Sequence, residues 1–158
     1  MAESLSFEQV LERDGRLVYT NKGVSMMPLL REGRDLMVIE KKPPEGVKKW
    51  DAVLFRRPDV SGRGAYVLHR VLRVNGDGTY WIVGDNCLSG ETVKEEHILG
   101  VLRAVVRDAK TIPTDSPGMR AYVWLWCVCP PLRFFLLRLR SCAAAALRKV
   151  KRLLVRKK

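Results

Sequence analysis

The sequence predicts a mainly β fold: an antiparallel β core with a short N-terminal helix and a basic, amphipathic helical tail at the C-terminus. Short runs rich in β-branched and aromatic residues recur through the first part of the chain, and glycine, proline and asparagine separate them. No long helical pattern lies between these runs, so nothing supplies the crossover helices that parallel strands require. Acidic residues then stop at Asp115, and leucine, alanine, arginine and lysine dominate the rest of the chain.

A short helix is expected before the first strand. Residues 6–13 carry apolar side chains at helical spacing and begin with Ser6, which can cap the helix. The pair Asp14-Gly15 then ends the segment, because glycine readily adopts the backbone conformation found after a helix.

Six segments have strand character. They are residues 16–20, 35–40, 52–55, 66–74, 79–83 and 98–106. Between two of them, Asn75-Gly76-Asp77-Gly78 has the composition of a hairpin turn. We expect the last segment to be the closing strand of the β body.

The composition changes near Pro113, where we place a domain boundary. Residues 1–112 are expected to form the β domain, and residues 113–120 a polar, proline-containing linker. Residues 121–158 are expected to form the helical tail. A chain of 158 residues has room for one compact domain with such an appendage.

The net charge of +12 is concentrated in this tail. All 17 acidic residues lie at or before Asp115, whereas 11 of the 29 basic residues lie at or after Arg120. The first 119 residues are therefore nearly neutral, with 18 bases against 17 acids. A cationic tail favours an anionic partner for that segment only.

The four cysteines do not predict a metal site or a disulfide framework. Cys87, Cys127, Cys129 and Cys142 include no Cys-x-x-Cys pair and no histidine at zinc-ligand spacing. Buried thiols are the simplest interpretation of the three in the apolar tail. We expect no metal and no cofactor.

Three polar positions stand out as candidates for chemistry. Ser25 lies in a turn between two expected strands. His69 lies inside an apolar β-type run, and an imidazole with a pKa near ~6.5 can accept a serine proton. Asp85 follows a strand and could orient that imidazole. Each also has an ordinary structural interpretation, as a turn residue or a half-buried histidine; His97, in a charged stretch, is a weaker base candidate.

Four short motifs occur in order between Gly23 and Asn86. They are Ser25-Met26-Met27-Pro28, Gly33-Arg34-Asp35-Leu36-Met37-Val38, Leu68-His69-Arg70-Val71 and Gly84-Asp85-Asn86. In this order they resemble the conserved boxes of the signal peptidase family, the S24/S26-type serine peptidases. The resemblance is to the endoplasmic-reticulum and archaeal type, which has histidine where the bacterial type has lysine.

The resemblance implies a serine endopeptidase that cleaves signal- or leader-like peptides after small residues. Ser25 would attack the scissile carbonyl, His69 would take its proton, and Asp85 would stabilise or orient His69. The backbone N–H of Ser25 is the first candidate oxyanion donor. The family usually has a hydroxyl residue where this chain has Gly23, and one missing donor costs about 3 kcal/mol of transition-state stabilisation.

The tail predicts peripheral association with an anionic membrane through residues 121–158. From position 132, basic residues alternate with apolar clusters, which suits a helix lying in the interface. Residues 121–129 are too short to span a bilayer, and residues 1–14 are acidic and polar rather than an anchor. Basic flanks favour the cytoplasmic face. The alternatives to membrane binding are a tail helix packed on the β body and a disordered basic end. Nucleic acid is a less favoured partner for the tail. The sequence does not indicate an oligomeric state.

Two other functions compete with the peptidase. A degenerate peptidase fold could act as a non-catalytic membrane-surface or partner-binding module, which Gly23 and the absence of an N-terminal anchor favour. Self-cleaving repressors share the β core, but they use a lysine base, and this chain has His69 at that position.

Overall fold

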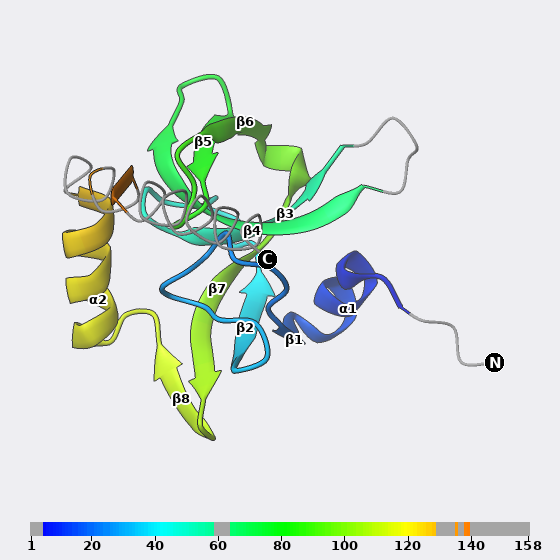
Figure 1. The fold of residues 1–158 in the computed structure, drawn as a ribbon. Helices are drawn as coiled ribbons and strands as arrows, with labels where there is room; N and C mark the ends of the chain where they lie inside the picture. Colours follow the sequence, from blue (N-terminus) through cyan, green and yellow to red (C-terminus); the bar gives the residue numbers. More distant parts are fainter. Residues whose placement is uncertain (1–4, 59–63, 129–134, 136–137, 140–158) are drawn as a thin grey trace, which may run out of the picture.

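The computed structural model describes residues 5–58, 64–128, 135 and 138–139, and they form one open antiparallel sheet with a helix towards each end (Figure 1). The strand order is β1-β2-β7-β3-β4-β5-β6, and β8 pairs with β7 beside this path. Every strand pair is antiparallel, from β1–β2 to β7–β8. The predicted mainly β, antiparallel fold is confirmed.

The strands agree closely with the six expected segments. Their bounds are β1 Arg16–Thr20, β2 Asp35–Lys41, β3 Ala52–Arg57, β4 Ala65–Val74, β5 Thr79–Val83, β6 Gly90–Lys94, β7 Ile98–Arg107 and β8 Lys110–Pro113. The two strands that were not predicted, β6 and β8, are short and polar. Both are held by pairing with an apolar neighbour, β5 and β7 respectively, rather than by an apolar pattern of their own. A short 3₁₀ turn, η1 (Glu95–His97), joins β6 to β7.

The N-terminal helix α1 (Phe7–Asp14) forms as expected. Ser6 caps it in a capping box with Gln9: the Ser6 hydroxyl accepts from the Gln9 N–H, and the Gln9 side chain accepts from the Ser6 N–H. Gly15 ends the helix at φ 67°, the left-handed conformation that glycine adopts without steric cost. The buried Leu11 attaches the helix to the sheet.

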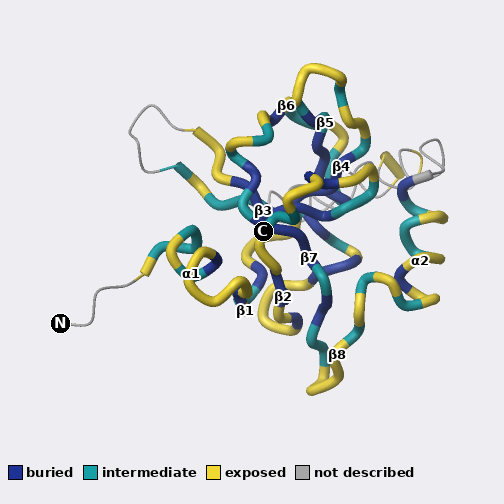
Figure 2. The backbone as a smooth tube through the Cα atoms, turned by 180° about the vertical axis from the view of Figure 1, so that it is seen from behind, coloured by how far each residue is buried: buried dark blue, intermediate teal, exposed yellow. Residues whose placement is uncertain are grey.

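The sheet has an apolar cluster on each face. Figure 2 shows in dark blue the buried stretches of the backbone that supply their residues. Strand β3 contributes to both, because successive side chains point to opposite faces. Ala52 and Leu54 belong to the first cluster, which also contains Leu11 of α1. Val53 and Phe55 belong to the second, together with residues of β4, β5, β6 and β7. This alternation decides on which face each polar residue of the site lies.

The helix α2 (Pro117–Val123) begins within the segment expected to be a linker, and the π-helical turn η2 (Trp124–Val128) follows it. Ser116 is its N-cap residue and Pro117 stands at its first position, where a missing N–H is harmless. Met119 is buried in the first apolar cluster, so α2 packs on the β body.

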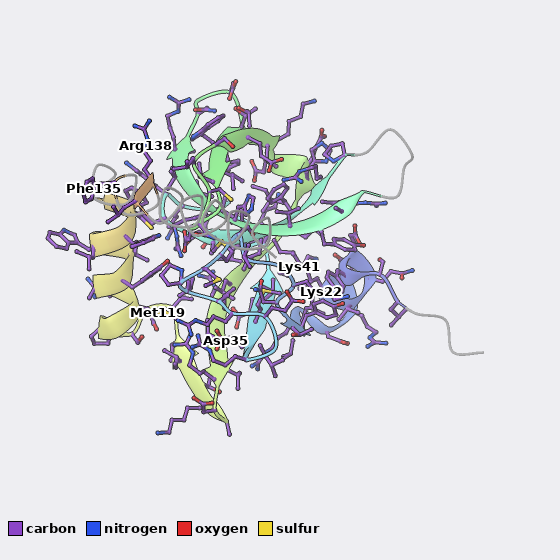
Figure 3. The ribbon with its side chains drawn as sticks, in the orientation of Figure 1. Lys22, Asp35, Lys41, Met119, Phe135 and Arg138 are labelled. Atoms are coloured by element: carbon purple, nitrogen blue, oxygen red, sulfur yellow. The ribbon has the colours of Figure 1, made fainter. Side chains whose placement is uncertain are left out.

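Most of the predicted amphipathic tail lies outside the described residues. Beyond η2 only Phe135, Arg138 and Leu139 are described; all three are helical and exposed (Figure 3).

Asp35 is the buried charge that joins β2, β7 and the Ser25 loop (Figure 3). Its carboxylate accepts hydrogen bonds from Arg34 and Arg107 and from the Arg31 N–H at 2.8 Å. Arg107 also donates to the Leu29 carbonyl at 2.8 Å, which ties the loop to the sheet. Burial alone would raise the pKa of Asp35, but these donors outweigh it and hold the pKa far below its usual range.

Replacement of Asp35 by asparagine is expected to lower the free energy of unfolding at pH 7 by about 3 kcal/mol, because the arginines lose their anionic partner. Since the folded-state pKa is depressed, the contribution is complete above the unfolded pKa and is lost as pH falls below about 4. Urea unfolding of both proteins at pH 7 and pH 3.5 measures this. Their difference should shrink at the lower pH, and the exposed Glu45→Gln serves as the control. A constant difference would contradict the assigned ionisation.

Candidate active site

Ser25 lies in the loop between β1 and β2, which buried side chains fix to the sheet. Met26 and Leu30 are 1% and 0% exposed and belong to the first apolar cluster. Turn-type bonds join Met27 N–H to Val24 O at 3.1 Å and Leu30 N–H to Met26 O at 3.0 Å. The half-buried Ser25 is therefore held on an ordered segment, between buried Met26 and exposed Val24.

The turn after β5 brings Ser25 and His69 together at Gly84. A Cβ on Gly84 would lie 2.8 Å from the Ser25 carbonyl oxygen, 2.9 Å from His69 Nε2 and 2.8 Å from Cys87 Sγ. The turn also donates to the serine loop, from the Asn86 N–H to Ser25 O at 2.7 Å and from Asn86 Nδ2 to Val24 O at 3.0 Å. Only a residue without a side chain permits this approach. The Ser25 backbone carbonyl and the His69 ring therefore both lie against Gly84.

His69 is 8% exposed and faces the second apolar cluster. It pairs with Val53 across β3 and β4, and its ring centroid lies 6.1 Å from that of Phe55. Burial lowers the pKa of His69 below its ordinary value of 6.5; the nearby Arg57 adds to this, while Glu91 and Asp85 oppose it. The imidazole is therefore neutral at pH 7, the state in which it can accept a proton.

Asp85 is fully buried and ion-paired with Arg70. Arg70 donates to both carboxylate oxygens, at 2.9 and 2.8 Å, and also to the Trp50 carbonyl. The Tyr122 hydroxyl of α2 donates to Asp85 at 2.9 Å, and Trp126 donates to its backbone carbonyl at 2.9 Å. Asp85 acts on its predicted partner His69 only through the electrostatic effect of its negative charge. Its hydrogen bonds instead hold the Gly84–Asn86 turn and α2 in place.

Strand geometry explains this pairing. His69 and Arg70 are neighbours in β4, so their side chains point to opposite faces of the sheet. Arg70 and its partner across the strands, Ala52, lie on the face that α2 covers, where Asp85 is also found. His69 lies on the other face.

Gly23, two positions before Ser25, has φ 81°, in the left-handed region that L side chains rarely adopt. Its N–H donates to Glu32 at 2.9 Å, and its carbonyl accepts from Asn21 at 3.1 Å. The backbone at this position therefore suits glycine, and a serine here would be strained. This gives a local conformational reason for the departure from the Ser-containing pattern.

Glu91 and Arg57 were not predicted as site residues. Glu91 Oε1 lies 3.7 Å from His69 Nδ1, and Arg57 donates to Glu91 at 2.9 and 2.5 Å. Glu91 lies in the short polar strand β6, where nothing in the local sequence separates it from an ordinary surface acid. Only the pairing of β6 with β5 brings it to the histidine.

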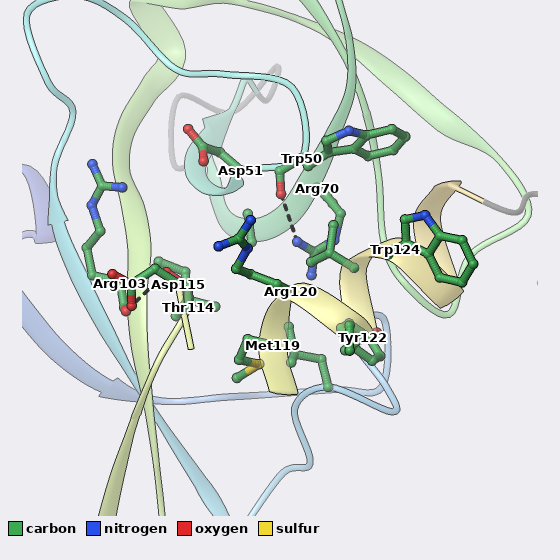
Figure 4. Close-up of a pocket in the computed structure, with 15 residues that line it drawn as sticks. Trp50, Asp51, Arg70, Arg103, Thr114, Asp115, Met119, Arg120, Tyr122 and Trp124 are labelled. Carbon is green, nitrogen blue, oxygen red and sulfur yellow. Dashed lines mark hydrogen bonds between the residues drawn. The ribbon is translucent and has the colours of Figure 1, made fainter. Parts of the chain in front are cut away.

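A separate cleft of about 640 Å³ lies on the face of the sheet opposite His69 (Figure 4). Ala52 and Leu102 line it from the sheet, Trp50 lines it from the turn before β3, and Met119 and Trp124 line it from α2 and η2. Arg70 reaches this cleft with its bond to the Trp50 carbonyl, whereas His69 does not line it. Arg70 lines the cleft and pairs with Asp85, so this ion pair connects the cleft to the Gly84 turn.

The chain matches no protein-family model, no curated protein and no solved structure. Within residues 5–58, 64–128, 135 and 138–139, no three His, Cys, Asp or Glu side chains are grouped so as to hold a metal ion. In the same part of the chain, no helix has the length and apolarity needed to cross a membrane.

Replacing Gly84 with alanine is expected to disrupt the site. The new Cβ would press on the Ser25 backbone and the His69 ring, so the two must separate. We expect a loss of about 1–3 kcal/mol in the free energy of unfolding, the usual cost of overpacking. Urea unfolding measures it, with Gly76→Ala as the control, since a Cβ on Gly76 meets open space. Equal stability of both variants would argue against the close approach.

Proposed function

We propose that this protein is a serine peptidase of the signal-peptidase type, with Ser25 as nucleophile and His69 as general base. The observation that carries the proposal is that the Ser25 backbone carbonyl and Nε2 of a buried, neutral His69 both lie against Gly84. The four motifs that resemble the signal peptidase boxes support it, because the serine box, the histidine box and the Gly-Asp-Asn box contribute to this one place. The antiparallel sheet is consistent with that family.

In the proposed reaction the Ser25 hydroxyl oxygen attacks the scissile carbonyl carbon while His69 Nε2 accepts the hydroxyl proton. The tetrahedral intermediate collapses, the C–N bond breaks, and the imidazolium gives its proton to the leaving amine. A water molecule then attacks the acyl-serine ester, again with His69 accepting a proton. Collapse returns that proton to Ser25 and releases the carboxyl product.

Asp85 is proposed to support this chemistry in two ways. Its negative charge favours the imidazolium that forms on His69, as its effect on the His69 pKa indicates. Its hydrogen bonds to Arg70, Tyr122 and, through its carbonyl, Trp126 keep the Gly84–Asn86 turn in position. The backbone N–H of Ser25 is the proposed oxyanion donor. The resemblance implies an extended peptide substrate with a small residue before the cleaved bond.

Cleavage of a signal-peptide-like substrate in anionic liposomes tests the proposal. Ser25→Ala and His69→Ala should each lower kcat by at least about 10³-fold, since nucleophile and base act as a unit. Activity of the native protein should rise with pH through the depressed His69 pKa, below about 6.5, and then level off. His97→Ala, which changes the other histidine, should leave the rate unchanged. Full activity of Ser25→Ala would refute the peptidase.

A non-catalytic binding module is the second candidate, and the conformation of Gly23 favours it. The left-handed backbone at this position is strained for any residue with a side chain, including the usual hydroxyl donor. An acylating active-site probe distinguishes the two functions. A peptidase is labelled at Ser25, and a binding module is not.

We also propose that residues 121–158 attach the protein to an anionic membrane surface, on the cytoplasmic face. These residues include 10 basic side chains and no acidic one, so they carry the positive charge that attracts anionic lipid. At their N-terminal end, Trp124 and Leu125 expose apolar side chains. Each basic residue near such a surface contributes about 1 kcal/mol.

Co-sedimentation with vesicles measures this attachment. The full chain should bind phosphatidylglycerol-containing vesicles, and binding should weaken with salt. Changing Arg148, Lys149, Lys151 and Arg152 to glutamine should lower the affinity by roughly 100-fold or more. Changing Lys48 and Lys49 of the body should have little effect. Equal binding to neutral vesicles would contradict the electrostatic attachment.

A further inference from the structure

Arg57, His69 and Glu91 lie on one face of the sheet, although they come from three strands. Val53 pairs with His69, so Arg57, four residues further along β3, points to the same face as His69. On the other side, Val71 of β4 pairs with Ile82, and Ile82 pairs with Glu91. The register therefore fixes a row of an arginine, a histidine and a glutamate beside the second apolar cluster.

The contacts in this row are specific. His69 Nδ1 is buried and has no hydrogen-bond partner among the described residues, and Glu91 Oε1 lies 3.7 Å from it. Arg57 holds Glu91 with two parallel hydrogen bonds, from Nε at 2.9 Å and from Nη2 at 2.5 Å. The carboxylate is thus fixed in front of the imidazole, a little beyond hydrogen-bond distance.

The remaining charged and titratable groups around His69 do not compete for Nδ1. Both oxygens of Asp85 accept from Arg70. The thiol of Cys87 lies against Gly84, on the side of the ring where the other nitrogen, Nε2, is found. In the described part of the chain, Glu91 is the one acid with a carboxylate oxygen within 4 Å of the imidazole.

We propose that Glu91 is the positioning residue of His69: it receives the Nδ1–H of the imidazolium when Nε2 takes the Ser25 proton, and Arg57 sets how strongly it does so. This rests on the proposed peptidase function. In the resting state burial keeps His69 neutral and ready to accept a proton, and the bidentate Arg57 pair offsets part of the charge of Glu91. The neutral ring that accepts at Nε2 already carries its proton at Nδ1. Protonation at Nε2 gives the ring a positive charge and makes Nδ1–H a stronger donor, and a shift of about 1 Å or less closes the 3.7 Å gap.

The two acids have different tasks. Asp85 stabilises the turn through Arg70 and α2, on one face of the sheet. Glu91 acts on the imidazole on the other face. Glu91 and Arg57 are partly exposed, so the variants needed to test them are not core substitutions.

The proposal predicts opposite effects for the two partners. Glu91→Gln keeps the shape and removes the charge, so the His69 pKa should fall, and the acid limb of the kcat–pH profile should move to lower pH. Arg57→Gln frees Glu91 to accept a hydrogen bond from Nδ1, so the His69 pKa should rise and the acid limb of the kcat–pH profile should move to higher pH. Glu91→Gln should also lower kcat by about tenfold or more with little change in KM, because the imidazolium loses its partner in the transition state. A merely structural role would not move the two profiles in opposite directions.

Nuclear magnetic resonance titration of the full chain reads His69 without any need for catalysis. The chain has two histidines, so a His97→Gln background leaves one imidazole signal. Glu96→Gln, an exposed acid close to the other histidine, is the matched control and should leave the His69 titration unchanged. Glu91→Asp keeps the negative charge but moves it away from Nδ1, so the His69 pKa in this variant should lie between that of the native protein and that of Glu91→Gln.

The results separate the two proposals. If the His69 titration shifts in opposite directions in Glu91→Gln and Arg57→Gln but no peptide is cleaved, the coupling stands and the peptidase fails. If peptide is cleaved but Glu91→Gln leaves the titration, the kcat–pH profile and kcat unchanged, Glu91 is not the positioning residue. A shift in Asp85→Asn alone would transfer that role to Asp85.

Discussion

The site depends on a close approach that only glycine allows. At Gly84 the backbone of the serine loop, the ring of His69 and the thiol of Cys87 all come within about 3 Å of the place where a side chain would begin. Asn86 then holds the serine loop by two hydrogen bonds. Residues that are far apart in the chain meet because one turn has no side chain at this point. Every proposed chemical role depends on that contact.

The same turn connects the two faces of the sheet. On one face it meets Ser25 and His69; on the other, Asp85 is fixed by Arg70 and by the Tyr122 hydroxyl of α2. Burial together with the Asp85 carboxylate raises the pKa of Tyr122 far above its usual range, so its hydroxyl stays a donor. The helix that leads into the basic tail is therefore part of the support of the site.

Among the residues that the structure describes, the buried carboxylates have charged partners. Asp35 is surrounded by Arg34 and Arg107, and Asp85 by Arg70, as the cost of an unpaired buried ion requires. His69 is different, because its burial is not matched by a hydrogen bond at Nδ1 within the described residues, and it stays neutral. The two buried carboxylates thus fix the frame, while the partly exposed Glu91 remains available to respond when the histidine changes charge.

The sequence by itself determined the elements whose signals are local. Alternating apolar residues and turn residues act within a few positions, so α1 and six strands could be predicted, and Ser25 and His69 stood out as a serine in a turn and a histidine in an apolar strand. What only the tertiary structure decided is which groups meet. The strands β6 and β8 form through pairing with a neighbour, Asp85 bonds Arg70 because adjacent strand residues face opposite sides, and Glu91 reaches His69 through the register of β4, β5 and β6. Register joins positions that are distant in the chain, and local pattern carries no information about it.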